Sequence, residues 1–500
     1  MPIDALTRSL ARAGLSPAEP LLIACSGGRD SQVLMHAAAA LHRARPVTVA
    51  HVHHGLQQAA DDWLDFCAAE AMRLGLPFLH RRLSPPLLPG RPHPGGLEAW
   101  AREWRYRALA EMATEAGATV VLTAHHAHDQ LETVEIRRRR GTGILGLAGM
   151  RAISPLPHAP AGMRLLRPFL ELPREVLEQW ARSRRIGWVD DPSNADARFT
   201  RNRVRHHLVT QLSTGQQSMP AELQAIGLFQ QAADRIQRQA ADDVTACSLQ
   251  IAAPVSGQTA GSPATALSAS GLPVLSRAAL RRLDAARRAE ALRYWLGLAG
   301  CRMPSRLKLI ELERQFVLAD AAQAILRHDG IGFLRYRDRI GLMPRVAVIQ
   351  PLLLRWQGEG CIELPSGRLQ VDTADGDEPG ALEAAWLREQ ALLIDQGRGR
   401  DRWRPRPAAP SRSWKNLMQE RGVPPCLRAS LPVLRLGGQL LFAAPFGTSA
   451  PDRAVPPVAA AEASGAAVEQ SAPALRFTPG ASTGFVRLCW VPSEEIQPWV

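Results

Sequence analysis

The sequence predicts an α/β protein: an N-terminal domain with a parallel sheet, then a helical domain, then a small mixed α/β C-terminal domain. Short apolar runs alternate with helical stretches over roughly the first two hundred residues, which is typical of a parallel sheet with helices on both faces. Residues 221–343 are mostly helical in pattern and rich in Arg, and short strand-like segments return between 346 and 447. A chain of 500 residues exceeds what one hydrophobic core usually supports, so several domains are expected.

The predicted parallel sheet is built from three apolar runs. Residues 21–25 form the first strand, and a glycine-containing turn leads from it into a helical stretch, 31–42. Residues 46–52 form the second strand, 63–74 have apolar residues at helical spacing, and 119–123 form another buried strand. Polar motifs directly follow these strands, at the carboxyl ends where parallel sheets bind ligands. The sequence therefore predicts a binding site at this edge of the sheet.

The expected domain boundaries follow changes in composition. Ser, Ala, Gly, Thr and Pro dominate residues 252–271, which predicts a flexible insertion in the helical domain. A Pro/Ala/Ser-rich stretch, 448–484, is expected to be largely disordered, and residues 485–500 have no pattern that predicts a structure. The three folded domains are expected at 1–212, 213–345 and 346–447.

The charge balance indicates a polyanionic partner. Sixty Lys and Arg residues against 47 Asp and Glu give a formal net charge of +13, which favours binding to phosphates through counterion release. No apolar run reaches the roughly 20 residues that span a bilayer, and the first ten residues contain no signal-peptide core. A cytoplasmic protein without a membrane partner is expected.

The cysteines indicate neither disulfides nor a metal cluster. Seven cysteines are scattered along the chain, and none belongs to a CxxC pair. An odd, dispersed set argues against a disulfide framework and against a structural zinc site, so reduced thiols are expected.

The most specific motif directly follows the first strand, and it consists of Ser26, Gly27, Gly28, Arg29, Asp30 and Ser31. The two glycines allow backbone N–H groups to approach a pyrophosphate closely, and the helix that Ser31 starts directs its positive end at the same anion. The lysine and the spacing of a Walker A loop are absent from the motif. It resembles the SGGxDS signature of PP-loop ATP pyrophosphatases, which have an adenine nucleotide α-hydrolase-like fold and adenylate a substrate. By this resemblance the loop binds ATP, and Asp30 holds Mg²⁺, an ion that prefers oxygen ligands.

Two further motifs follow the other strands. Residues 51–55, His-Val-His-His-Gly, end the second strand, and residues 124–133 follow the third. In the latter segment Asp129 and Glu132 are three positions apart and share one face of a helix, where a carboxylate pair can bind an ammonium group. The histidines of the same segment are too closely spaced for one helix face to bring them to a single metal ion.

Together the three motifs resemble tRNA(Ile)-lysidine synthetase, and further matches follow in that family's order. They are a helix at 97–106, a glycine-rich turn at 140–150, an Arg-Pro-Phe segment at 166–170, and the DPSN and RNxxRH motifs at 190–206. Residues 415–432 are similar to the family's tRNA-binding end domain. The resemblance covers most of residues 20–447 and is strongest in the first two hundred.

The resemblance implies a specific reaction. Such enzymes use ATP to adenylate the C2 oxygen of the wobble cytidine, position 34, in the isoleucine tRNA with a CAU anticodon, and the amine of free L-lysine then displaces AMP to give lysidine. Carried over by position, the catalytic residues are Asp30 and Asp129, and the lysine-binding residues are Asp129 and Glu132. The residues implied at the phosphates or the tRNA backbone are Arg102, Arg105, Arg201, Arg203 and Arg205. The oligomeric state is open, with a dimer as one option.

The sequence departs from the family's pattern at three places. His128 replaces the first of two acidic residues in the third motif, and His53 stands where Asp or Asn is more common. Residues 137–140 are four consecutive arginines in place of a mixed apolar helix face, which predicts a more basic surface or a local shift in packing. Activity is expected to be retained because the glycine loop and the carboxylate pair are intact.

Two other functions stay open. A PP-loop tRNA thiolase would share the ATP loop, but such enzymes generally use CxxC cysteines for a cluster or a persulfide, and the chain has no such pair. A non-catalytic tRNA-binding relative would fit the net charge and His128, although the intact loop argues against it.

Overall fold

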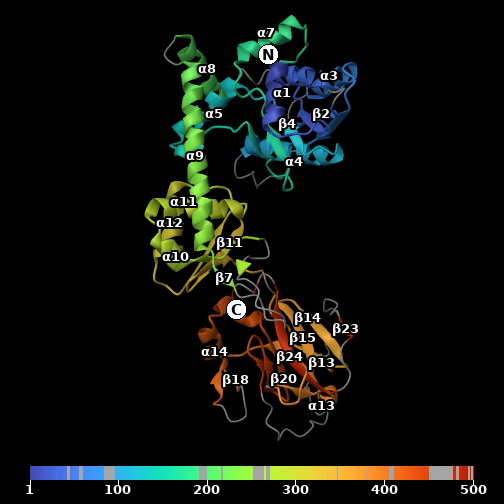
Figure 1. Cartoon of the computed structure of the whole chain (residues 1–500), viewed down its shortest axis with the longest axis vertical. Coiled ribbons are helices and arrows are strands. Elements are labelled where there is room, and N and C mark those ends of the chain that lie inside the picture. The colour runs from blue at the N-terminus through green and yellow to red at the C-terminus, as the bar shows by residue number, and fades with distance from the viewer. Residues whose placement is uncertain are drawn as a thin grey trace. The chain divides into compact units, whose positions relative to one another are not determined.

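The chain divides after Arg235 into two units, Met1–Arg235 and Ile236–Val500, in the computed structural model (Figure 1). Each unit is described by itself below. The structure describes residues 1–41, 45–55, 60–83, 96–190, 200–214, 218–251, 264–265, 271–345, 347–378, 380–404, 410–449, 477–479, 484–493, 496 and 499.

The first unit contains the predicted parallel sheet. Among its described residues the strand order is β3-β2-β1-β4-β6-β5, and all neighbours are parallel except the β5–β6 pair. The strands are β1 Leu21–Ala24, β2 Val47–His53, β3 Phe78–Arg82, β4 Val120–Leu122, β5 Ile153–Pro155 and β6 Arg164–Leu166. The helices are α1 Pro2–Arg12, α2 Arg29–Ala39, α3 Ala60–Arg73, α4 Gly96–Glu115, α5 Ala127–Arg139, α6 Ile144–Leu147, α7 Arg174–Ser183, α8 Thr200–Ser213 and α9 Met219–Cys247, which crosses the boundary between the units.

Helices cover both faces of this sheet, so its strands are apolar at every position. Leu21 and Ile23 of β1 pack into a core with side chains of α1, α2, α3 and α7. Leu22, which points to the opposite face, packs into a second core with α4. All three side chains are fully buried, and burying each one stabilises the fold by about 1.5–3 kcal/mol. This arrangement explains why the strands read as continuous apolar runs.

The order in which strands are added to the sheet reverses at β1. From β1 the chain continues to β2 on one side, and it returns later to β4 on the other side. The loops that leave the carboxyl ends of β1 and β4 therefore separate and leave a crevice between them, which is where ligands bind in sheets of this type. These loops carry two of the three polar motifs.

The first part of the second unit combines helices with a sheet that the sequence pattern did not predict. Its helices are α10 Arg277–Arg282, α11 Ala285–Leu298, α12 Arg306–Glu313 and a π-helical turn, η2 Arg314–Leu318. In the described residues, an antiparallel sheet of order β10-β11-β12-β9 lies beside them, with β9 Leu275–Ser276, β10 Gln323–His328, β11 Ile331–Tyr336 and β12 Arg339–Leu342. Asp329 and Gly330, both with positive φ, make the turn between β10 and β11. Asp-Gly is a strong hairpin signal, so the sequence did contain a sign of this sheet.

The predicted flexible insertion, 252–271, lies mostly outside the described residues. Its described part includes β8 Ala264–Thr265, which pairs with β7 Gln250–Ile251. The segment predicted to be disordered, 448–484, is also mostly outside the described residues, but 477–479 within it form a strand.

The C-terminal part of the second unit contains, in its described residues, two five-stranded sheets of order β13-β17-β20-β21-β22 and β16-β24-β15-β14-β23. Its strands are β13 Leu352–Leu354, β14 Glu359–Leu364, β15 Gly367–Ala374, β16 Leu382–Glu383, β17 Leu392–Gln396, β18 Arg402–Trp403, β19 Arg412–Ser413, β20 Pro432–Leu436, β21 Gln439–Ala443, β22 Gly447–Thr448, β23 Phe477–Pro479 and β24 Phe485–Pro492. Its helices are α13 Ala384–Glu389, α14 Trp414–Arg421 and the 3-10 turn η3 Pro425–Ser430. The mixed α/β prediction for this part is confirmed.

The end of the chain belongs to this C-terminal fold. β24 lies between β16 and β15, and it pairs with β15 from Gly367 to Ala374. Ile496 and Trp499 beyond it are buried. The described residues of the segment 485–500, for which the sequence predicted no structure, therefore contribute an interior strand and part of the core.

None of the helices in the described part of the chain combines the length and the apolar character that a bilayer crossing requires.

Candidate active site

Gly27 sets the shape of the loop that follows β1. Its φ is +87°, and a Cβ added there would lie 2.8 Å from Cγ2 of Val189 and 3.3 Å from Sγ of Cys67. A left-handed backbone and the close neighbours both require glycine. The N–H of Val189 donates to the carbonyl of Gly27 at 3.1 Å, so the loop is tied to the segment after α7.

The two serines of the motif hold the loop against the start of α2. The Ser31 hydroxyl donates to the carbonyl of Gly28 at 2.7 Å and accepts from the N–H of Ser26 at 3.2 Å. Gly28 is the N-cap of α2 and has no side chain that caps it. The first-turn N–H groups of a helix have no partner within the helix, and its N-terminus carries partial positive charge. The loop thus has the backbone geometry of an anion site.

Arg29, which the sequence assigned to ATP, contacts two carboxylates. Its Nη1 donates to Oε2 of Glu178 on α7 at 2.8 Å, and its Nε donates to Oδ1 of Asp30 at 3.1 Å. The Arg29 side chain is largely buried between them. In this arrangement Arg29 orients Asp30, and its contact with ATP stays a prediction.

His126 connects the loop after β1 to the helix after β4. Its Nε2 lies 3.5 Å from Oδ2 of Asp30. It is also the N-cap of α5: its Nδ1 accepts from the N–H of Asp129 at 3.4 Å, and Asp129 Oδ2 accepts from the N–H of His126 at 3.0 Å. Asp30 and Asp129, which belong to two different sequence motifs, are therefore joined through one imidazole.

The charges around His126 favour the ionised forms of all three groups. Burial lowers the pKa of His126, but the hydrogen bond to Asp30 and the charges of Asp129, Asp30 and Glu132 outweigh it and raise that pKa. Burial raises the pKa of Asp30, yet His126 and Arg29 lower it overall. The pKa of Asp129 is also lowered, because the charges of His126 and Arg201 outweigh its burial.

The predicted carboxylate pair faces two arginines of α8. Arg201 Nη2 donates to Asp129 Oδ1 and Arg201 Nε donates to Glu132 Oε2, each at 2.7 Å. Arg205 Nε donates to Glu132 Oε1 at 2.6 Å. Glu132 is 2% exposed. The structure thus brings together Asp30, Asp129 and Glu132, which the sequence assigned to one site, and adds His126 to them.

Known protein families match this chain in three successive segments. Three family models match: the PP-loop domain at residues 4–212, the TilS substrate binding domain at 275–340 and the TilS substrate C-terminal domain at 392–460. A tRNA(Ile)-lysidine synthase of Burkholderia pseudomallei is 34% identical over 478 residues, which are 89% of this chain and 92% of that one. The chain belongs to the tRNA(Ile)-lysidine synthase family. Relatives with the same name from Ralstonia nicotianae and Pseudomonas aeruginosa are each 35% identical and cover 86% and 84% of this chain, and 89% and 88% of their own lengths. The family resemblance and the PP-loop fold predicted from the sequence are confirmed.

Further arginines of the lysidine synthase motifs lie on α4 and α8. The guanidinium carbons of Arg102 and Arg105 each lie 5.3 Å from the ring centre of Tyr106, a cation–π geometry. Burial lowers the pKa of Arg105, and repulsion from Arg102 and Arg201 lowers it further, against the attraction of Tyr106. Arg105 is therefore electrostatically coupled to the arginine that binds the carboxylate pair. Arg203 lies exposed on α8.

His51 is buried and His54 and His125 are partly buried, and the pKa of each of these histidines is lowered, which favours the neutral form. His51 Nδ1 donates to the carbonyl of Cys25 at 2.9 Å, and burial lowers the pKa of His51 to about 4. Burial and the charge of Arg105 lower the pKa of His54 to about 4, and burial lowers that of His125 to about 3. Among the described residues no group of three His, Cys, Asp or Glu side chains is placed to hold a metal ion. These histidines contribute hydrogen bonds and packing at the crevice.

The departures from the lysidine synthase pattern have local structural roles. His128 Nδ1 accepts from the N–H of Arg174 at 3.3 Å, at the start of α7, so this side chain is directed away from the carboxylate pair. His53 Nδ1 accepts from the N–H of Gly55 at 3.1 Å. Asp129 is hydrogen-bonded to His126 and Arg201 rather than to either of these histidines.

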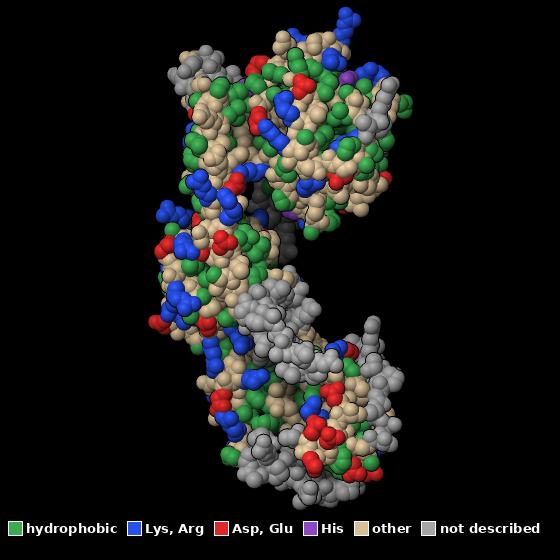
Figure 2. All heavy atoms as spheres, in the orientation of Figure 1, with side chains coloured by type: hydrophobic (Ala, Val, Ile, Leu, Met, Phe, Trp, Pro, Cys, Tyr) green, Lys and Arg blue, Asp and Glu red, His purple; other side chains and the backbone are tan. Residues whose placement is uncertain are grey.

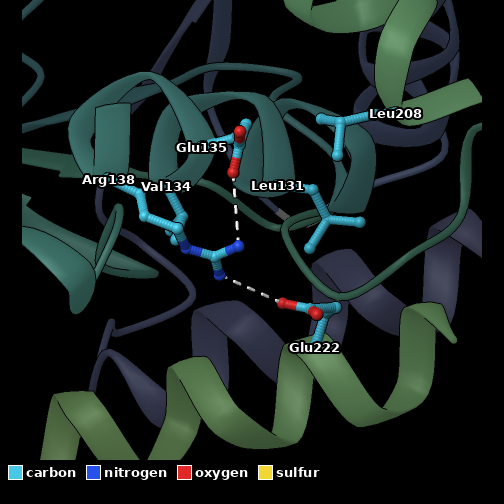
Figure 3. Close-up of a pocket in the computed structure, with 6 residues that line it drawn as sticks. All are labelled: Leu131, Val134, Glu135, Arg138, Leu208 and Glu222. Atoms are coloured by element: carbon cyan, nitrogen blue, oxygen red, sulfur yellow. Dashed lines mark hydrogen bonds and ion pairs between the residues drawn. The ribbon is translucent and has the colours of Figure 1, made fainter. Parts of the chain in front are cut away.

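Three of the four consecutive arginines, Arg137, Arg138 and Arg139, have side-chain partners. Arg137 Nη1 donates to the carbonyls of Gly146 and Gly149, each at 3.0 Å, so it holds the glycine-rich turn. Arg138 donates to Glu135 at 3.2 Å and to Glu222 of α9 at 3.5 Å (Figure 3). Arg137 is held against the glycine-rich turn, whereas Arg138, Arg139 and Arg140 are exposed, so both alternatives left by the sequence stay open.

Figure 3 also shows a small pocket between α5, α8 and α9. It is lined by Leu131, Val134 and Leu208, and by Arg138 with its partners Glu135 and Glu222. The apolar residues belong to a small core in which Val204 and Leu208 of α8 are buried. This core holds α8 beside α5, and so positions Arg201 and Arg205 over the carboxylates.

No role was predicted for His126 from the sequence, although its position was informative. It directly precedes α5, and Asp129 stands three residues later, which is the spacing of a capping box. The usual cap is Ser or Thr, so the histidine masked the pattern. The motif segment 191–199, which includes most of the DPSN match, lies outside the described residues.

Proposed function

We propose that this protein ligates L-lysine to C2 of the wobble cytidine, position 34, of the isoleucine tRNA with a CAU anticodon. The reaction consumes ATP, passes through an adenylated cytidine, and releases AMP and pyrophosphate. The observation that carries the proposal is the carboxylate pair of Asp129, which is partly buried, and Glu132, which is buried; the pair is joined through His126 to Asp30 of the PP-loop. Membership of the lysidine synthase family and the match to the PP-loop domain support it.

The loop from Ser26 to Ser31 is suited to the phosphates of ATP. Its unpaired first-turn N–H groups and the N-terminus of α2 provide positive potential without a lysine. Asp30 is the residue that would hold Mg²⁺, which commonly takes one or two carboxylates and completes its shell with phosphate oxygens and water. The lowered pKa of Asp30 keeps this carboxylate ionised. When bound, Mg²⁺ neutralises charge on the phosphates.

Lysine transfer requires two further conditions. The cytidine C2 oxygen becomes a leaving group only once it is adenylated, and holding the lysine amine beside C2 raises its effective concentration. Asp129 and Glu132 supply two carboxylates for an ammonium group. The lowered pKa of Asp129 makes it a weak proton acceptor, which favours a role in binding over general-base catalysis.

The substrate tRNA requires a basic surface. Figure 2 shows Lys and Arg side chains on both units, intermixed with Asp and Glu on the visible face. With a net charge of +13, this distribution supports contacts with a large polyanion rather than one small anion. We place the reaction in the cytoplasm, and a dimer stays a prediction.

The alternatives gain less support. A thiolase would require reactive cysteines, whereas Cys25 and Cys67 beside the loop are 3% and 0% exposed. A non-catalytic tRNA-binding relative would not need the carboxylate pair beside an intact loop.

The proposal is tested by incorporation of radiolabelled L-lysine into a transcript of the isoleucine tRNA with a CAU anticodon, with and without ATP. We expect ATP-dependent incorporation that Asp30→Ala abolishes and that Asp4→Ala, at an exposed position of α1, retains. A methionine tRNA transcript with the same anticodon is the substrate control. ATP binding without any lysine incorporation would contradict the proposal and favour the non-catalytic alternative.

A further inference from the structure

Arg201 occupies the position between the two carboxylates that were predicted to bind the lysine ammonium. Its two guanidinium nitrogens each donate at 2.7 Å, Nη2 to Asp129 and Nε to Glu132. It is the side chain that spans both carboxylates in this structure. Its side chain is 36% exposed, whereas those of Asp129 and Glu132 are 13% and 2% exposed.

All four carboxylate oxygens at this position have a donor. Asp129 Oδ1 accepts from Arg201, and its Oδ2 accepts from the N–H of His126. Glu132 Oε2 accepts from Arg201, and its Oε1 accepts from Arg205. Two carboxylates and two guanidiniums also balance in charge. An ammonium group added here would be a third cation among buried groups, which is unfavourable unless one cation leaves.

We propose that Arg201 occupies the ammonium position of the substrate-free enzyme and is displaced when lysine binds. Arg201 is then a residue that determines the affinity for the amine substrate, because lysine must compete with it for Asp129 and Glu132. This inference rests on the proposed function, since it assumes that lysine is the substrate.

The packing of α8 explains why Arg201 rather than Arg205 leaves. Arg205 follows Val204 and precedes Leu208, which are 1% and 5% exposed and belong to the core shared with α5. Arg201 is the second residue of α8, and helix ends unfold locally at low cost. Arg205 therefore stays on Glu132 while the first turn of α8 moves.

The test compares Arg201→Ala with Arg139→Ala in the full chain. Arg139 is the matched control, because it is also an arginine with a 2.7 Å bond from Nε to a glutamate, Glu135, on the surface of α5. Lysine affinity is measured by calorimetry without ATP or tRNA, and thermal unfolding confirms that each variant is folded. We expect Arg201→Ala to lower the Kd for lysine about three- to tenfold, the factor by which a competing side chain reduces the binding-competent fraction. Arg139→Ala should leave the Kd unchanged.

Guanidinium ion supplies a second readout. At millimolar concentration guanidinium should refill the position in Arg201→Ala and so raise the Kd for lysine back toward the wild-type value. It should have no effect on the Kd of the wild-type protein. If Arg201→Ala does not fold, Arg201→Lys replaces it. A lysine side chain cannot bridge two carboxylates with a planar pair of N–H groups, so a smaller decrease in Kd is expected.

A Kd for lysine that is unchanged, raised or undetectable in a folded Arg201 variant would overturn this inference. That outcome is distinct from failure of the proposed function. In the first case the wild-type protein incorporates lysine into tRNA with ATP, and in the second it does not.

Discussion

At the scale of single residues, two residues of the same type, or two members of one motif, can differ in how strongly a substitution affects the site. Gly27 and Gly28 are adjacent, yet only Gly27 has a positive φ and close neighbours. His51 reads as part of a polar motif, yet it is 4% exposed and bonded to a carbonyl. In both cases the surroundings of the residue, rather than its type, decide the consequence of a change.

Gly27→Ala is expected to destabilise the first unit by at least about 1–2 kcal/mol, the cost of a left-handed backbone in a residue with a Cβ, because Val189 must also move. Gly28→Ala is the control for stability, since its φ is −69° and the nearest atom to an added Cβ is 3.5 Å away. The measurement is thermal unfolding, with and without ATP. Equal melting temperatures for the two variants would show that the loop does not have this geometry.

Acidification is expected to destabilise the first unit through His51. Because the pKa of His51 is about 4 in the folded state and 6.5 ordinarily, the unfolded state binds more protons between these values. The stability is therefore complete above about pH 6.5 and falls as the pH decreases toward 4, by up to about 3 kcal/mol. His51→Gln should make this part of the unfolding profile less steep, while His54 and His125, whose pKa values are also lowered, account for the slope that remains. His207→Gln, at an exposed position, should leave the slope as it is, and the same slope in both variants would refute the assignment to His51.

At the scale of elements, α8 positions the arginines of the site, and its own position depends on apolar packing against α5. Leu208 and Val204 are buried in that contact. The ion pairs of Arg138 beside it involve a side chain that is 47% exposed. Burial and exposure predict very different energies for the two kinds of contact.

Leu208→Ala is expected to cost about 2–5 kcal/mol, the range for a buried Leu that leaves a cavity, and to reduce lysine incorporation because α8 no longer holds Arg205 on Glu132. Arg138→Ala should cost less than about 1 kcal/mol, as exposed ion pairs generally do. Thermal unfolding and the incorporation assay measure both effects. A larger loss for Arg138→Ala than for Leu208→Ala would reverse this ranking of the contacts.

At the scale of the whole molecule, segments distant in sequence complete each unit. β24 inserts between β15 and β16, and Trp499 is 1% exposed. A Cβ added to Gly341 would lie 3.0 Å from the Trp499 ring. The end of the chain is therefore part of the core of the second unit.

Trp499→Ala is expected to destabilise the second unit by about 3–5 kcal/mol, as loss of a buried Trp usually does. Phe485→Ala is the comparison, because Phe485 belongs to the same terminal segment and is 41% exposed. Urea unfolding followed by tryptophan fluorescence and limited proteolysis measures the difference. Wild-type stability in the Trp499 variant would exclude the terminal segment from the core.

Much of the first unit was predictable because its determinants are local. A short apolar run, a glycine loop and a helix start lie within a dozen residues, and the strand–helix alternation predicts a parallel sheet. In the second unit the Asp329–Gly330 turn is also a local signal, because Asp-Gly favours a hairpin. By contrast, β24 pairs with β15, a strand more than a hundred residues earlier. The sequence of β24 contains no signal that predicts this pairing.

The sequence by itself determined the PP-loop, the parallel sheet, the family and the carboxylate pair, because each is a pattern of neighbouring residues. The tertiary structure alone decided which groups meet. It placed His126 between Asp30 and Asp129, and it placed Arg201 on both carboxylates from 72 and 69 positions away in the chain. The physical reason is that ion pairs and hydrogen bonds form through space. The type of a residue determines which groups its side chain can bind. Which group it does bind depends on the packing of α5, α8 and the sheet.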